Sequence, residues 1–436
     1  MTVKEGFEQK IRSKKARIAI VGLGYVGLPL AVGFAQKNFT VFGIDLDKER
    51  VSRLQDGVSY ILDVPAEDLK KVIRSRKLIA TTSYEEIRTV DVVVICVPTP
   101  LRKTKDPDLS FIISAVQNLA PFVHKGQLLI LESTTYPGTT EEVILPLIES
   151  EGLKAGRDFY LCFSPERVDP GNPTYRTENI PKIVGGITPE CSRLGKLFYE
   201  QLIQKVVTVS SPRVAEMVKL LENTFRGVNI ALVNEIALMC HHLHIDVWEV
   251  IEAAKTKPFG FMPFYPGPGL GGHCIPIDPI YLLWKARLHG FEVRFIELAT
   301  QINSYMPRYV VERTMELLNE VKKPLQGSEI LVLGVSYKKG VNDVRESPAL
   351  EVITHLKEKG AVVFYHDPFV PQFSVDGKEM KSVSLEPSFL KRMDCVVLVT
   401  DHPINYQKIF EGSSLILDTR NAFKDVKGKG AKIVRL

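Results

Sequence analysis

The sequence predicts an α/β fold: two doubly wound parallel-sheet domains joined by a central helical domain with a long helix. Short apolar runs alternate with helical segments in residues 17–163 and again in residues 329–418, as strands and helices of parallel sheets do. Between these regions, residues 212–245 contain one glycine and repeat apolar residues at helical spacing. The length of 436 residues allows two or three domains. We expect their boundaries at 1–210, 211–318 and 319–436.

Composition excludes several functional classes. The chain is 45% hydrophobic and 25% charged, and its net charge of +5 is too small and too dispersed to indicate nucleic-acid binding. No segment has the length of a membrane span, and the basic run at residues 10–17 is followed by no apolar stretch typical of a secretory signal. The six cysteines form no Cys-x-x-Cys pair, so we expect reduced thiols, a cytoplasmic protein and no metal site.

The first predicted strand, Arg17–Val21, runs into a Gly-x-Gly-x-x-Gly turn at Gly22, Gly24 and Gly27, and a helix follows. Such a turn between a strand and a helix is the Rossmann-like fingerprint of dinucleotide binding. Its glycines allow close approach of a pyrophosphate, whose charge the N–H groups at the helix start can hold. Asp45 ends the second strand, where a carboxylate bonds ribose hydroxyls and repels a 2′-phosphate, which favours NAD over NADP. The alternative is a similar sheet that binds no dinucleotide.

Later strands of the first domain end in residues suited to ligand binding. One strand leads into Thr99, the next into Thr134 and a third into Glu166. The carboxyl ends of parallel strands form the edge at which open α/β sheets bind ligands. Glu166 is therefore a candidate acid or base, with a solvated loop carboxylate as the alternative.

The predicted long helix carries Lys219 and Asn223 four residues apart, which places both side chains on one face. A polar stripe on a packed helix is the alternative interpretation. A long helix between two α/β domains is also a natural surface for self-association, so we expect a homodimer through it.

A glycine-rich loop, Gly267–Asp278, follows the helical region. Four glycines and a proline within six residues exclude a helix or a regular strand and let the backbone approach a ligand closely. Cys274 in this loop could be a nucleophile, a metal ligand or a small buried hydrophobic residue. No second pair of metal-type ligands accompanies it, so we exclude the metal site.

The last third repeats the strand–turn–helix pattern from residue 329 without a Gly-x-Gly-x-x-Gly turn. Its turn carries Tyr337 and Lys338, and Arg345 follows a few residues later. A tyrosine, lysines and an arginine at strand ends suit a phosphorylated ligand with a ring to stack. This region is predicted to be a second Rossmann-like domain.

Together, these motifs resemble the UDP-sugar 6-dehydrogenase family, which includes the UDP-glucose, UDP-N-acetylglucosamine and UDP-N-acetylmannosamine enzymes. The motifs that carry the resemblance are Gly22–Pro29, Ser164–Glu166, Lys219 with Asn223, Gly271–Asp278 and Asp343–Ala349. The similarity spans nearly the whole chain. It implies NAD-dependent oxidation of the C6 primary alcohol of a UDP-sugar to a carboxylate, in two successive hydride transfers.

The chemistry that the resemblance implies needs a thiol. An alcohol is first oxidised to an aldehyde, which has no hydride-donating hydroxyl until a nucleophile adds to it. The thiolate of Cys274 would add to give a thiohemiacetal, and oxidation of that adduct gives a thioester that water hydrolyses. The resemblance assigns oxyanion stabilisation to Lys219 and Asn223. It assigns acid–base catalysis to Asp278 and Glu166, and binding of the water to Thr134.

The resemblance also implies which residues contact the ligands. For NAD they are Gly22, Gly24, Tyr25, Val26, Gly27, Asp45, Arg50, Thr99, Thr134 and Arg345. For the UDP-sugar they are Arg167, Val168, Lys219, Asn223, Arg226, Lys255, Lys257, Gly267, Tyr337, Lys338 and Arg420. Many relatives place an arginine of the neighbouring subunit shortly before the glycine loop. This chain departs from them with Lys255 and Lys257, which lack the bidentate fork of arginine.

Two segments favour one sugar. Residues 166–172 are similar to the N-acetylhexosamine branch, and residues 257–267 are similar to UDP-N-acetylglucosamine 6-dehydrogenases. We therefore expect UDP-N-acetylglucosamine as the substrate and its uronic acid, a precursor of surface polysaccharides, as the product. UDP-N-acetylmannosamine and UDP-glucose are alternatives. A catalytically silent UDP-sugar-binding protein is the alternative of another class, against which the intact catalytic set argues.

Overall fold

The computed structural model describes residues 3–436 except residues 62, 103, 105, 170, 171, 173, 273, 274 and 376. The chain divides into two compact units. The first comprises Met1–Glu222 with Ile280–Gly290, and the second comprises Asn223–Pro279 with Phe291–Leu436. Each unit contains a sheet of mainly parallel strands, which confirms the predicted α/β class.

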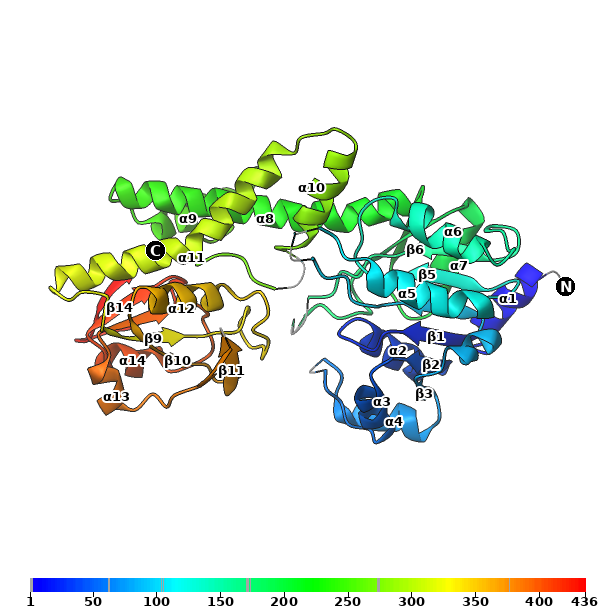
Figure 1. Ribbon diagram of the computed structural model, residues 1–436, viewed down its shortest axis with the longest axis horizontal. Helices are drawn as coiled ribbons and strands as arrows, with labels where there is room; N and C mark the ends of the chain where they lie inside the picture. The colour runs from blue at the N-terminus through cyan, green and yellow to red at the C-terminus, as the bar shows by residue number, and fades with distance from the viewer. Residues whose placement is uncertain are drawn as a thin grey trace. The chain divides into compact units, whose positions relative to one another are not determined.

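In the described part of the first unit, eight strands form one sheet in the order β3-β2-β1-β4-β5-β6-β7-β8. They are β1 (Arg17–Val21), β2 (Thr40–Ile44), β3 (Leu78–Thr81), β4 (Val92–Ile95), β5 (Leu128–Leu131), β6 (Tyr160–Phe163), β7 (Lys182–Gly186) and β8 (Val206–Val209). Figure 1 labels β1, β2, β3, β5 and β6 of this sheet. Neighbouring strands are parallel except β6 and β7. The order reverses at β1, which lies between β2 and β4, and ligands of such sheets bind at the carboxyl ends of the strands at this reversal.

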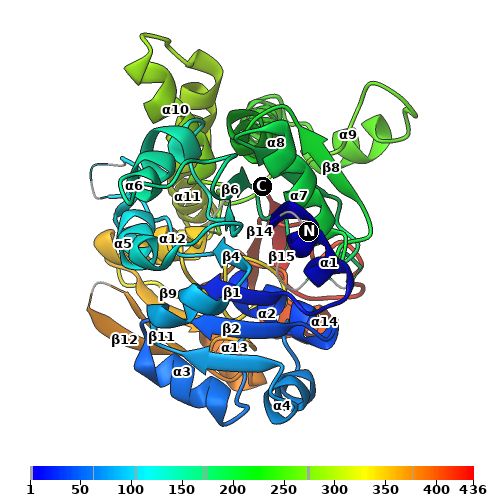
Figure 2. The ribbon, with the colours of Figure 1, turned by 90° about the vertical axis from the view of Figure 1, so that its right-hand side faces the viewer.

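Helices cover both faces of this sheet (Figure 2). They are α1 (Val3–Arg12), α2 (Gly27–Gln36), α3 (Lys48–Gln55), α4 (Ala66–Arg74), α5 (Ser110–Leu119), α6 (Leu145–Glu149) and α7 (Pro189–Tyr199), with shorter turns at Tyr84–Thr89, Ala120–Phe122 and Thr140–Ile144. α1, α2 and α7 share one hydrophobic core, in which Phe34 stacks on Phe198 at 4.4 Å between ring centroids. β4 and β5 are buried along their whole length, which explains their continuous apolar sequences.

The central helices are α8 (Pro212–His242), α9 (Val247–Ala254), α10 (Asp278–Leu288) and α11 (Arg294–Glu320). α8 is the predicted long helix, and it contributes residues to both units. It ends at His242 rather than near residue 245, because His244 takes the left-handed conformation (φ 56°) that closes helices. The N–H of Ile245 then donates to the carbonyl oxygen of Cys240 at 2.9 Å.

The second unit contains a parallel sheet in the order β10-β9-β13-β14-β15, made of five strands among the described residues. The strands are β9 (Glu329–Leu333), β10 (Val362–His366), β13 (Cys395–Leu398), β14 (Leu415–Asp418) and β15 (Lys432–Arg435), and an antiparallel hairpin joins β11 (Gln372–Val375) to β12 (Lys378–Lys381). The helices of this lobe are α12 (Pro348–Glu358), α13 (Pro387–Arg392) and α14 (Tyr406–Gly412). The second Rossmann-like domain is thus present as predicted.

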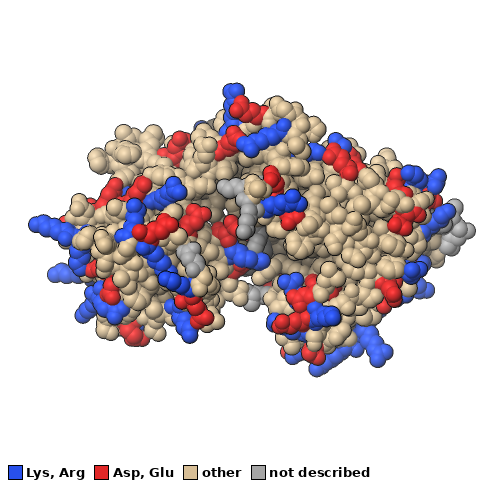
Figure 3. All heavy atoms as spheres, viewed as in Figure 1, with Lys and Arg blue, Asp and Glu red and all other residues tan. Residues whose placement is uncertain are grey.

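Three further features bear on function: membrane-spanning helices, metal sites and the distribution of surface charge. In the part of the chain that the structure describes, no helix combines the length and the apolar character needed to cross a bilayer, and no three His, Cys, Asp or Glu side chains are grouped as a metal ion requires. On the face shown in Figure 3, acidic and basic side chains are interspersed.

Candidate active site

The turn after β1 uses its three glycines for different purposes. Gly22 has a φ of 91°, and a Cβ there would lie 2.7 Å from the carbonyl oxygen of Cys96. A Cβ on Gly27 would lie 1.9 Å from the carbonyl oxygen of Gly22. The packing of the chain on itself therefore requires both glycines. A Cβ on Gly24 would meet nothing within 4 Å, so this glycine leaves open space beside the turn.

The open space at Gly24 adjoins the start of α2. No side chain caps this helix at Val26, so the first N–H groups of the helix are not taken up by a capping side chain. Such groups attract anions, and the missing Cβ gives a phosphate room to approach them. Tyr25, between these residues, is 43% exposed. The turn therefore has the shape and the donors that a pyrophosphate needs.

Asp45, which follows β2, organises the same turn. It is 8% exposed; its Oδ2 accepts the N–H of Leu23 at 2.9 Å, and its Oδ1 accepts the N–H of Asp47 at 3.0 Å. The guanidinium of Arg50 lies 3.6 Å from Oδ2. A carboxylate offers about four lone-pair sites, so Asp45 keeps acceptor capacity for ribose hydroxyls. Together with the turn, these residues fit an NAD site.

Thr134 follows β5 and accepts a hydrogen bond from Nζ of Lys219 on α8. Lys219 is only 7% exposed, so its ammonium group is held inside the protein beside this hydroxyl. Thr99, after β4, is fixed through its backbone, where its carbonyl oxygen accepts from the hydroxyl of Tyr281 at 3.0 Å. The structure thus brings together two members of the predicted catalytic set, Lys219 and Thr134.

Both oxygens of the Glu166 carboxylate are hydrogen-bonded within the protein. Its Oε1 accepts the backbone N–H groups of Arg167 at 2.8 Å and Val168 at 2.7 Å, and its Oε2 accepts from Nζ of Lys182 at 2.7 Å. Lys182 also donates to Glu132, whose other oxygen accepts from the hydroxyl of a tyrosine. Glu166 therefore closes its own loop onto a buried ionic cluster.

This cluster sets the charge of Glu166. Burial opposes ionisation, but the ammonium group of Lys182 and the hydrogen bonds outweigh it and lower the pKa of Glu166 to about 2. Glu132, on the other side of Lys182, has its pKa raised by burial. A carboxyl group with so low a pKa stays ionised at neutral pH, so it is a weak base and a poor proton donor.

The guanidinium of Arg167 forms hydrogen bonds with other groups of the protein. Its Nε and Nη2 donate to the carboxylate of Glu222 on α8 at 3.1 and 2.6 Å, and its Nη1 donates to the carbonyl oxygen of Pro181 at 2.6 Å. This bidentate pair is a strong and directional contact. The loop at Glu166–Val168 is therefore held from two sides, by Lys182 and by Glu222.

In the second unit, Asn223 on α8 donates through Nδ2 to Oδ2 of Asp278 at 2.5 Å. Asp278 begins α10 and is 1% exposed. The structure therefore pairs two more members of the predicted catalytic set. Arg226, three residues further along α8, is exposed.

The glycines of the predicted catalytic loop pack against the second Rossmann-like lobe. A Cβ on Gly267 would lie 2.4 Å from Nη1 of Arg420, and a Cβ on Gly271 would lie 2.9 Å from Cβ of Tyr337. A Cβ on Gly272, whose φ is 92°, would lie 3.0 Å from the ring of the same tyrosine. These glycines thus let protein groups approach the loop. Cys274 and His273 lie outside the described residues.

The turn after β9 carries Tyr337 and Lys338, both partly buried. The N–H of Tyr337 donates to the carbonyl oxygen of Asp343 at 2.9 Å. Arg345 binds the carboxylate of Asp343 in a bidentate fashion, with Nη2 at 2.6 Å. Arg420, which follows β14, donates from Nε to the carbonyl oxygen of Val399 at 3.0 Å. The structure thus places the predicted UDP-binding residues Tyr337, Lys338 and Arg420 in one lobe.

The two lysines before the glycine loop are on the surface. Lys255 pairs with Glu252 on the same helical stretch, and Nζ of Lys257 lies over the ring of Phe259 at 5.2 Å from its centroid. Exposed pairs of this kind contribute little to stability. Neither contact involves another site residue.

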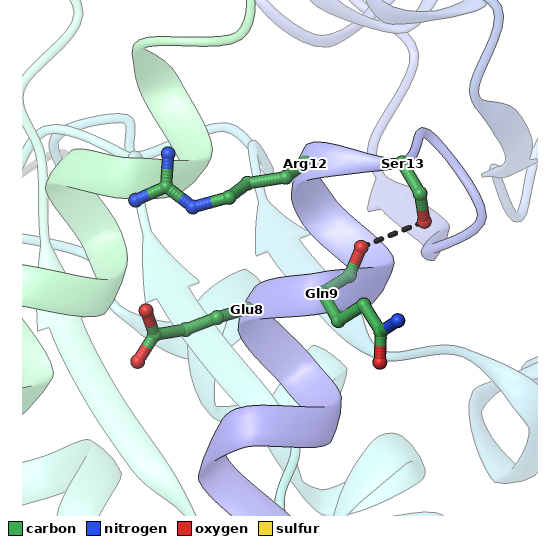
Figure 4. A pocket seen from close by; sticks show the side chains of 4 residues that line it. All are labelled: Glu8, Gln9, Arg12 and Ser13. Carbon is green, nitrogen blue, oxygen red and sulfur yellow. Dashed lines mark hydrogen bonds between the residues drawn. The ribbon is translucent and has the colours of Figure 1, made fainter.

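A separate hollow on α1 is lined by Glu8, Gln9, Arg12 and Ser13 (Figure 4). The hydroxyl of Ser13 donates to the carbonyl oxygen of Gln9 at 2.6 Å, as the figure shows, and Glu8 pairs with Arg193 at 2.6 Å. Its lining contains none of the predicted site residues, and the pair of Glu8 with Arg193 joins α1 to α7.

The buried partners of the site residues are not predicted from the sequence. Lys182 and Glu132 support Glu166, and His402 with Asp367 supports the turn at Tyr337. One signal in the sequence does indicate the first pair. A lysine opens one apolar strand and a glutamate closes another, and charged residues in such positions need partners once both strands are covered.

Comparisons with known proteins identify the family. Three domain models of the UDP-glucose/GDP-mannose dehydrogenase family match the chain: the NAD binding domain over residues 16–203, the central domain over residues 213–305 and the UDP binding domain over residues 331–425. The chain is 36% identical to a UDP-N-acetyl-D-mannosamine dehydrogenase of Pyrococcus horikoshii, covering 94% of this chain and 96% of that protein. It is 37% identical to a UDP-N-acetyl-D-glucosamine 6-dehydrogenase of Pseudomonas aeruginosa, covering 82% and 84%.

Solved structures agree as well. The solved structure of the UDP-D-ManNAc dehydrogenase of Pyrococcus horikoshii superimposes with a TM-score of 0.87 at 35% identity, covering 96% of this chain and 98% of that one. Nearly the full length is thus matched in sequence and in fold. The chain therefore belongs to the UDP-glucose/GDP-mannose dehydrogenase family and is an NAD-dependent UDP-sugar dehydrogenase.

Proposed function

We propose that this dehydrogenase oxidises the C6 primary alcohol of UDP-N-acetylglucosamine to the carboxylate and supplies the uronic acid for surface polysaccharide synthesis. The observation that carries the chemistry is the pair of contacts made by α8. Lys219 binds Thr134, and Asn223, four residues later, binds Asp278. A cation, an amide, a hydroxyl and a carboxylate are thus held in place, as oxyanion stabilisation and water activation require.

The proposed mechanism gives each residue one role. Bound NAD⁺ supplies the hydride acceptor for both oxidations. The thiolate of Cys274 adds to the C6 aldehyde, and the adduct is oxidised to a thioester. Lys219 and Asn223 stabilise the oxygen at C6 while it carries negative charge. Water then hydrolyses the thioester and regenerates the thiol.

Asp278 and Thr134 carry out the proton chemistry. Thr134 accepts from Lys219, so its own hydroxyl proton is available to hold a water. Asp278 accepts the amide of Asn223 through Oδ2, which fixes its carboxylate for proton transfer. Glu166, whose pKa lies near 2, suits a different role, since as a permanent carboxylate it shapes the loop Glu166–Val168.

The choice of sugar rests on resemblance. Residues 257–267 are similar to UDP-N-acetylglucosamine 6-dehydrogenases, and the polar loop after Glu166 is similar to the N-acetylhexosamine branch. The loop is rigidly held, because Arg167 is bound to Glu222 and Glu166 to Lys182. A rigid polar loop discriminates well, since a substrate that lacks its hydrogen-bonding group leaves the site unsatisfied.

Competition kinetics test this choice. UDP-N-acetylglucosamine, UDP-N-acetylmannosamine and UDP-glucose are mixed in pairs with excess NAD⁺, and each uronic acid is quantified by mass spectrometry. We expect the highest kcat/KM for UDP-N-acetylglucosamine. A higher value for either other sugar would overturn the substrate assignment and leave the dehydrogenase activity intact.

We also propose a homodimer formed through α8, in the cytoplasm. Phe225, Leu232 and Met239 recur every seven residues on this helix and are 46%, 53% and 48% exposed. Residues at this interval lie on one side of a helix, and an apolar stripe of this kind favours a partner. The five described cysteines are free and buried, as suits a reducing compartment.

Light scattering after size exclusion tests the dimer. Wild type should have twice the mass of one chain, and Leu232→Lys should shift it toward the monomer. Leu298→Lys is the matched control, because Leu298 on α11 is similarly exposed (51%) but lies off the stripe. Equal effects of both substitutions would contradict an interface on α8.

A further inference from the structure

His402 follows β13 and is 1% exposed, and its ring joins distant parts of the second Rossmann-like lobe. Its Nε2 lies 3.0 Å from Oδ2 of Asp367 and 2.9 Å from Oγ of Ser336. Its Nδ1 accepts the backbone N–H of Gly340 at 3.2 Å. Ser336 and Gly340 are the two ends of the turn that carries Tyr337 and Lys338.

The contact with Gly340 determines the form of the imidazole. A backbone N–H can only donate, so Nδ1 must be an acceptor and carry no proton. The ring is then neutral, with its proton on Nε2 directed at Asp367 and Ser336. The two ring nitrogens therefore hold different ends of the turn, Nδ1 directly at Gly340 and Nε2 through Ser336.

Asp367 shows why this lobe does not repeat the dinucleotide site. Like Asp45 in the first lobe, it follows the second strand and accepts N–H groups of the turn after the first, here those of Val335 and Ser336 at 2.8 and 3.1 Å. Its other oxygen accepts the N–H groups of two residues that follow it, at 2.8 and 3.1 Å. His402 occupies the remaining side, where Asp45 keeps capacity for a ribose. These contacts of the Asp367 carboxylate are thus all with groups of the protein.

The turn is also tied across its middle. The hydroxyl of Ser336 donates to the carbonyl oxygen of Lys338 at 2.9 Å. The hydroxyl of Thr400 donates to the carbonyl oxygen of Ser336 at 2.7 Å. The backbone that presents Tyr337 and Lys338 is therefore fixed before any ligand binds, which reduces the entropic cost of binding.

Tyr337 connects this turn to the glycine loop, because it packs against Gly271 and Gly272. Its ring and its Cβ occupy the space that side chains on Gly272 and Gly271 would fill, at 3.0 and 2.9 Å from the Cβ positions. A displaced Tyr337 would therefore leave the loop without support on this side. Gly272 lies two residues before Cys274 in the sequence.

We propose that His402 is a positioning residue that holds the turn Ser336–Gly340 for UDP binding and, through Tyr337, supports the loop that precedes Cys274. This inference rests on the proposed function, because it takes Tyr337 and Lys338 as contacts of the nucleotide. It predicts that one imidazole controls both the affinity for UDP and the reactivity of Cys274.

Calorimetric titration with UDP tests the first part with three substitutions. His402→Phe removes both ring nitrogens and keeps a ring of similar size. His402→Asn keeps an acceptor near Nδ1 for Gly340, and His402→Gln keeps a polar group near Nε2 only. His355→Gln is the matched control, because His355 is a partly buried histidine of α12 in the same lobe and contacts Glu358 at 2.9 Å.

We expect His402→Phe and His402→Gln to weaken UDP binding roughly tenfold, the effect of losing about one hydrogen bond that orders the turn. His402→Asn should restore binding to within about threefold of wild type, which corresponds to less than one such bond. KM for the UDP-sugar should rise while KM for NAD⁺ stays unchanged, because the predicted NAD contacts other than Arg345 belong to the first unit. Arg345 itself lies outside the turn Ser336–Gly340. A general loss of structure would change both values.

Alkylation by iodoacetamide, located by mass spectrometry, tests the second part. The five described cysteines are buried, so we expect modification of Cys274 to dominate. Its rate should differ between wild type and His402→Phe and be unchanged in His355→Gln. Unchanged UDP affinity in His402→Phe, or an equal loss in His355→Gln, would overturn the inference alone. A wild-type protein that binds no UDP would overturn the proposed function and this inference with it.

Discussion

Glu166 and Glu216 are both largely enclosed in the first unit, but their surroundings move their pKa values in opposite directions. Burial is the largest influence on each. At Glu166 the neighbouring Lys182 overcomes it, and the pKa falls to about 2. Glu216 on α8 accepts from Gly138 and Thr140 but has no cation beside it among these contacts, so its pKa rises to about 7. The neighbouring charge, and not the depth, decides the outcome.

The raised pKa of Glu216 predicts a pH dependence of stability. The folded protein holds this proton more tightly than the unfolded chain, so the contribution is complete below the ordinary carboxyl pKa and is lost as pH rises through about 7. A shift of this size corresponds to about 3 kcal/mol. In urea unfolding, the free energy of unfolding should fall less between pH 5 and pH 8 for Glu216→Gln than for wild type.

The amide of Glu216→Gln cannot accept at both oxygens, so we expect this variant to be less stable at every pH. The informative quantity is therefore the difference between pH 5 and pH 8. Glu141→Gln is the control, because Glu141 is more exposed and pairs with Arg213 on the surface. An unchanged pH difference in Glu216→Gln would contradict the raised pKa.

Cys274 carries the proposed covalent step. Cys274→Ser replaces the thiol by a much weaker nucleophile of similar size, so net formation of the uronic acid should fall below detection. Calorimetry should show UDP and NAD⁺ affinities within about twofold of wild type, since the residues assigned to binding are untouched. Turnover of the serine variant at the wild-type rate would contradict the thioester mechanism.

At the scale of elements, the turn between β1 and α2 separates a binding glycine from a structural one. Gly27→Ala would place a methyl group 1.9 Å from the carbonyl oxygen of Gly22, whereas Gly24→Ala meets nothing within 4 Å. We expect Gly27→Ala to lower the melting temperature by several degrees, on the order of 2 kcal/mol or more. Gly24→Ala should melt with wild type and raise KM for NAD⁺ at least tenfold.

Steady-state kinetics give KM for NAD⁺, and differential scanning fluorimetry gives the melting temperature, of both variants. KM for the UDP-sugar serves as the internal control, because Tyr337, Lys338 and Arg420, which are proposed to contact the UDP group, lie in the second unit. If Gly24→Ala bound NAD⁺ as tightly as wild type, the pyrophosphate would not approach the turn at this glycine.

The ionic cluster behind the loop at Glu166 gives a prediction for a tertiary contact. Lys182→Met would leave the carboxylates of Glu132 and Glu166 buried without their cation, which should lower the free energy of unfolding by about 3–5 kcal/mol. Adding Glu132→Gln removes one of the two charges and should recover part of the loss.

Urea unfolding of the single and double variants measures this coupling. Lys125→Met is the matched control, since Lys125 is a 74% exposed lysine that pairs with Asp158 at 3.5 Å. Its loss should stay below about 1 kcal/mol. Equal effects of Lys182→Met and Lys125→Met would show that the cluster holds nothing in place.

At the scale of the whole molecule, the α/β architecture is predictable because its central strands are covered on both faces. β1 has the predicted bounds, Arg17–Val21, and it is a short apolar run flanked by turn residues. β3 is not predicted, because it is four residues long and alternates buried and exposed positions. Local pattern identifies a strand only when burial makes its sequence distinctive.

Local sequence pattern also decides which residues of the candidate site can be predicted. Cys274, Lys219 and Asn223 occur in local motifs, so the sequence identifies them. Lys182 is joined to Glu132 across 50 residues and His402 to Ser336 across 66 residues. No local pattern encodes such pairs, because each partner is an ordinary residue until the fold brings the two together.

The most direct test of the central claim is the stoichiometry of oxidation. A limiting amount of UDP-N-acetylglucosamine is incubated with excess NAD⁺, NADH is measured by absorbance, and the product is identified by mass spectrometry. We expect two NADH for each sugar consumed and UDP-N-acetylglucosaminuronic acid as the only product. One NADH for each sugar with an aldehyde as product would contradict it, and so would the absence of NADH formation.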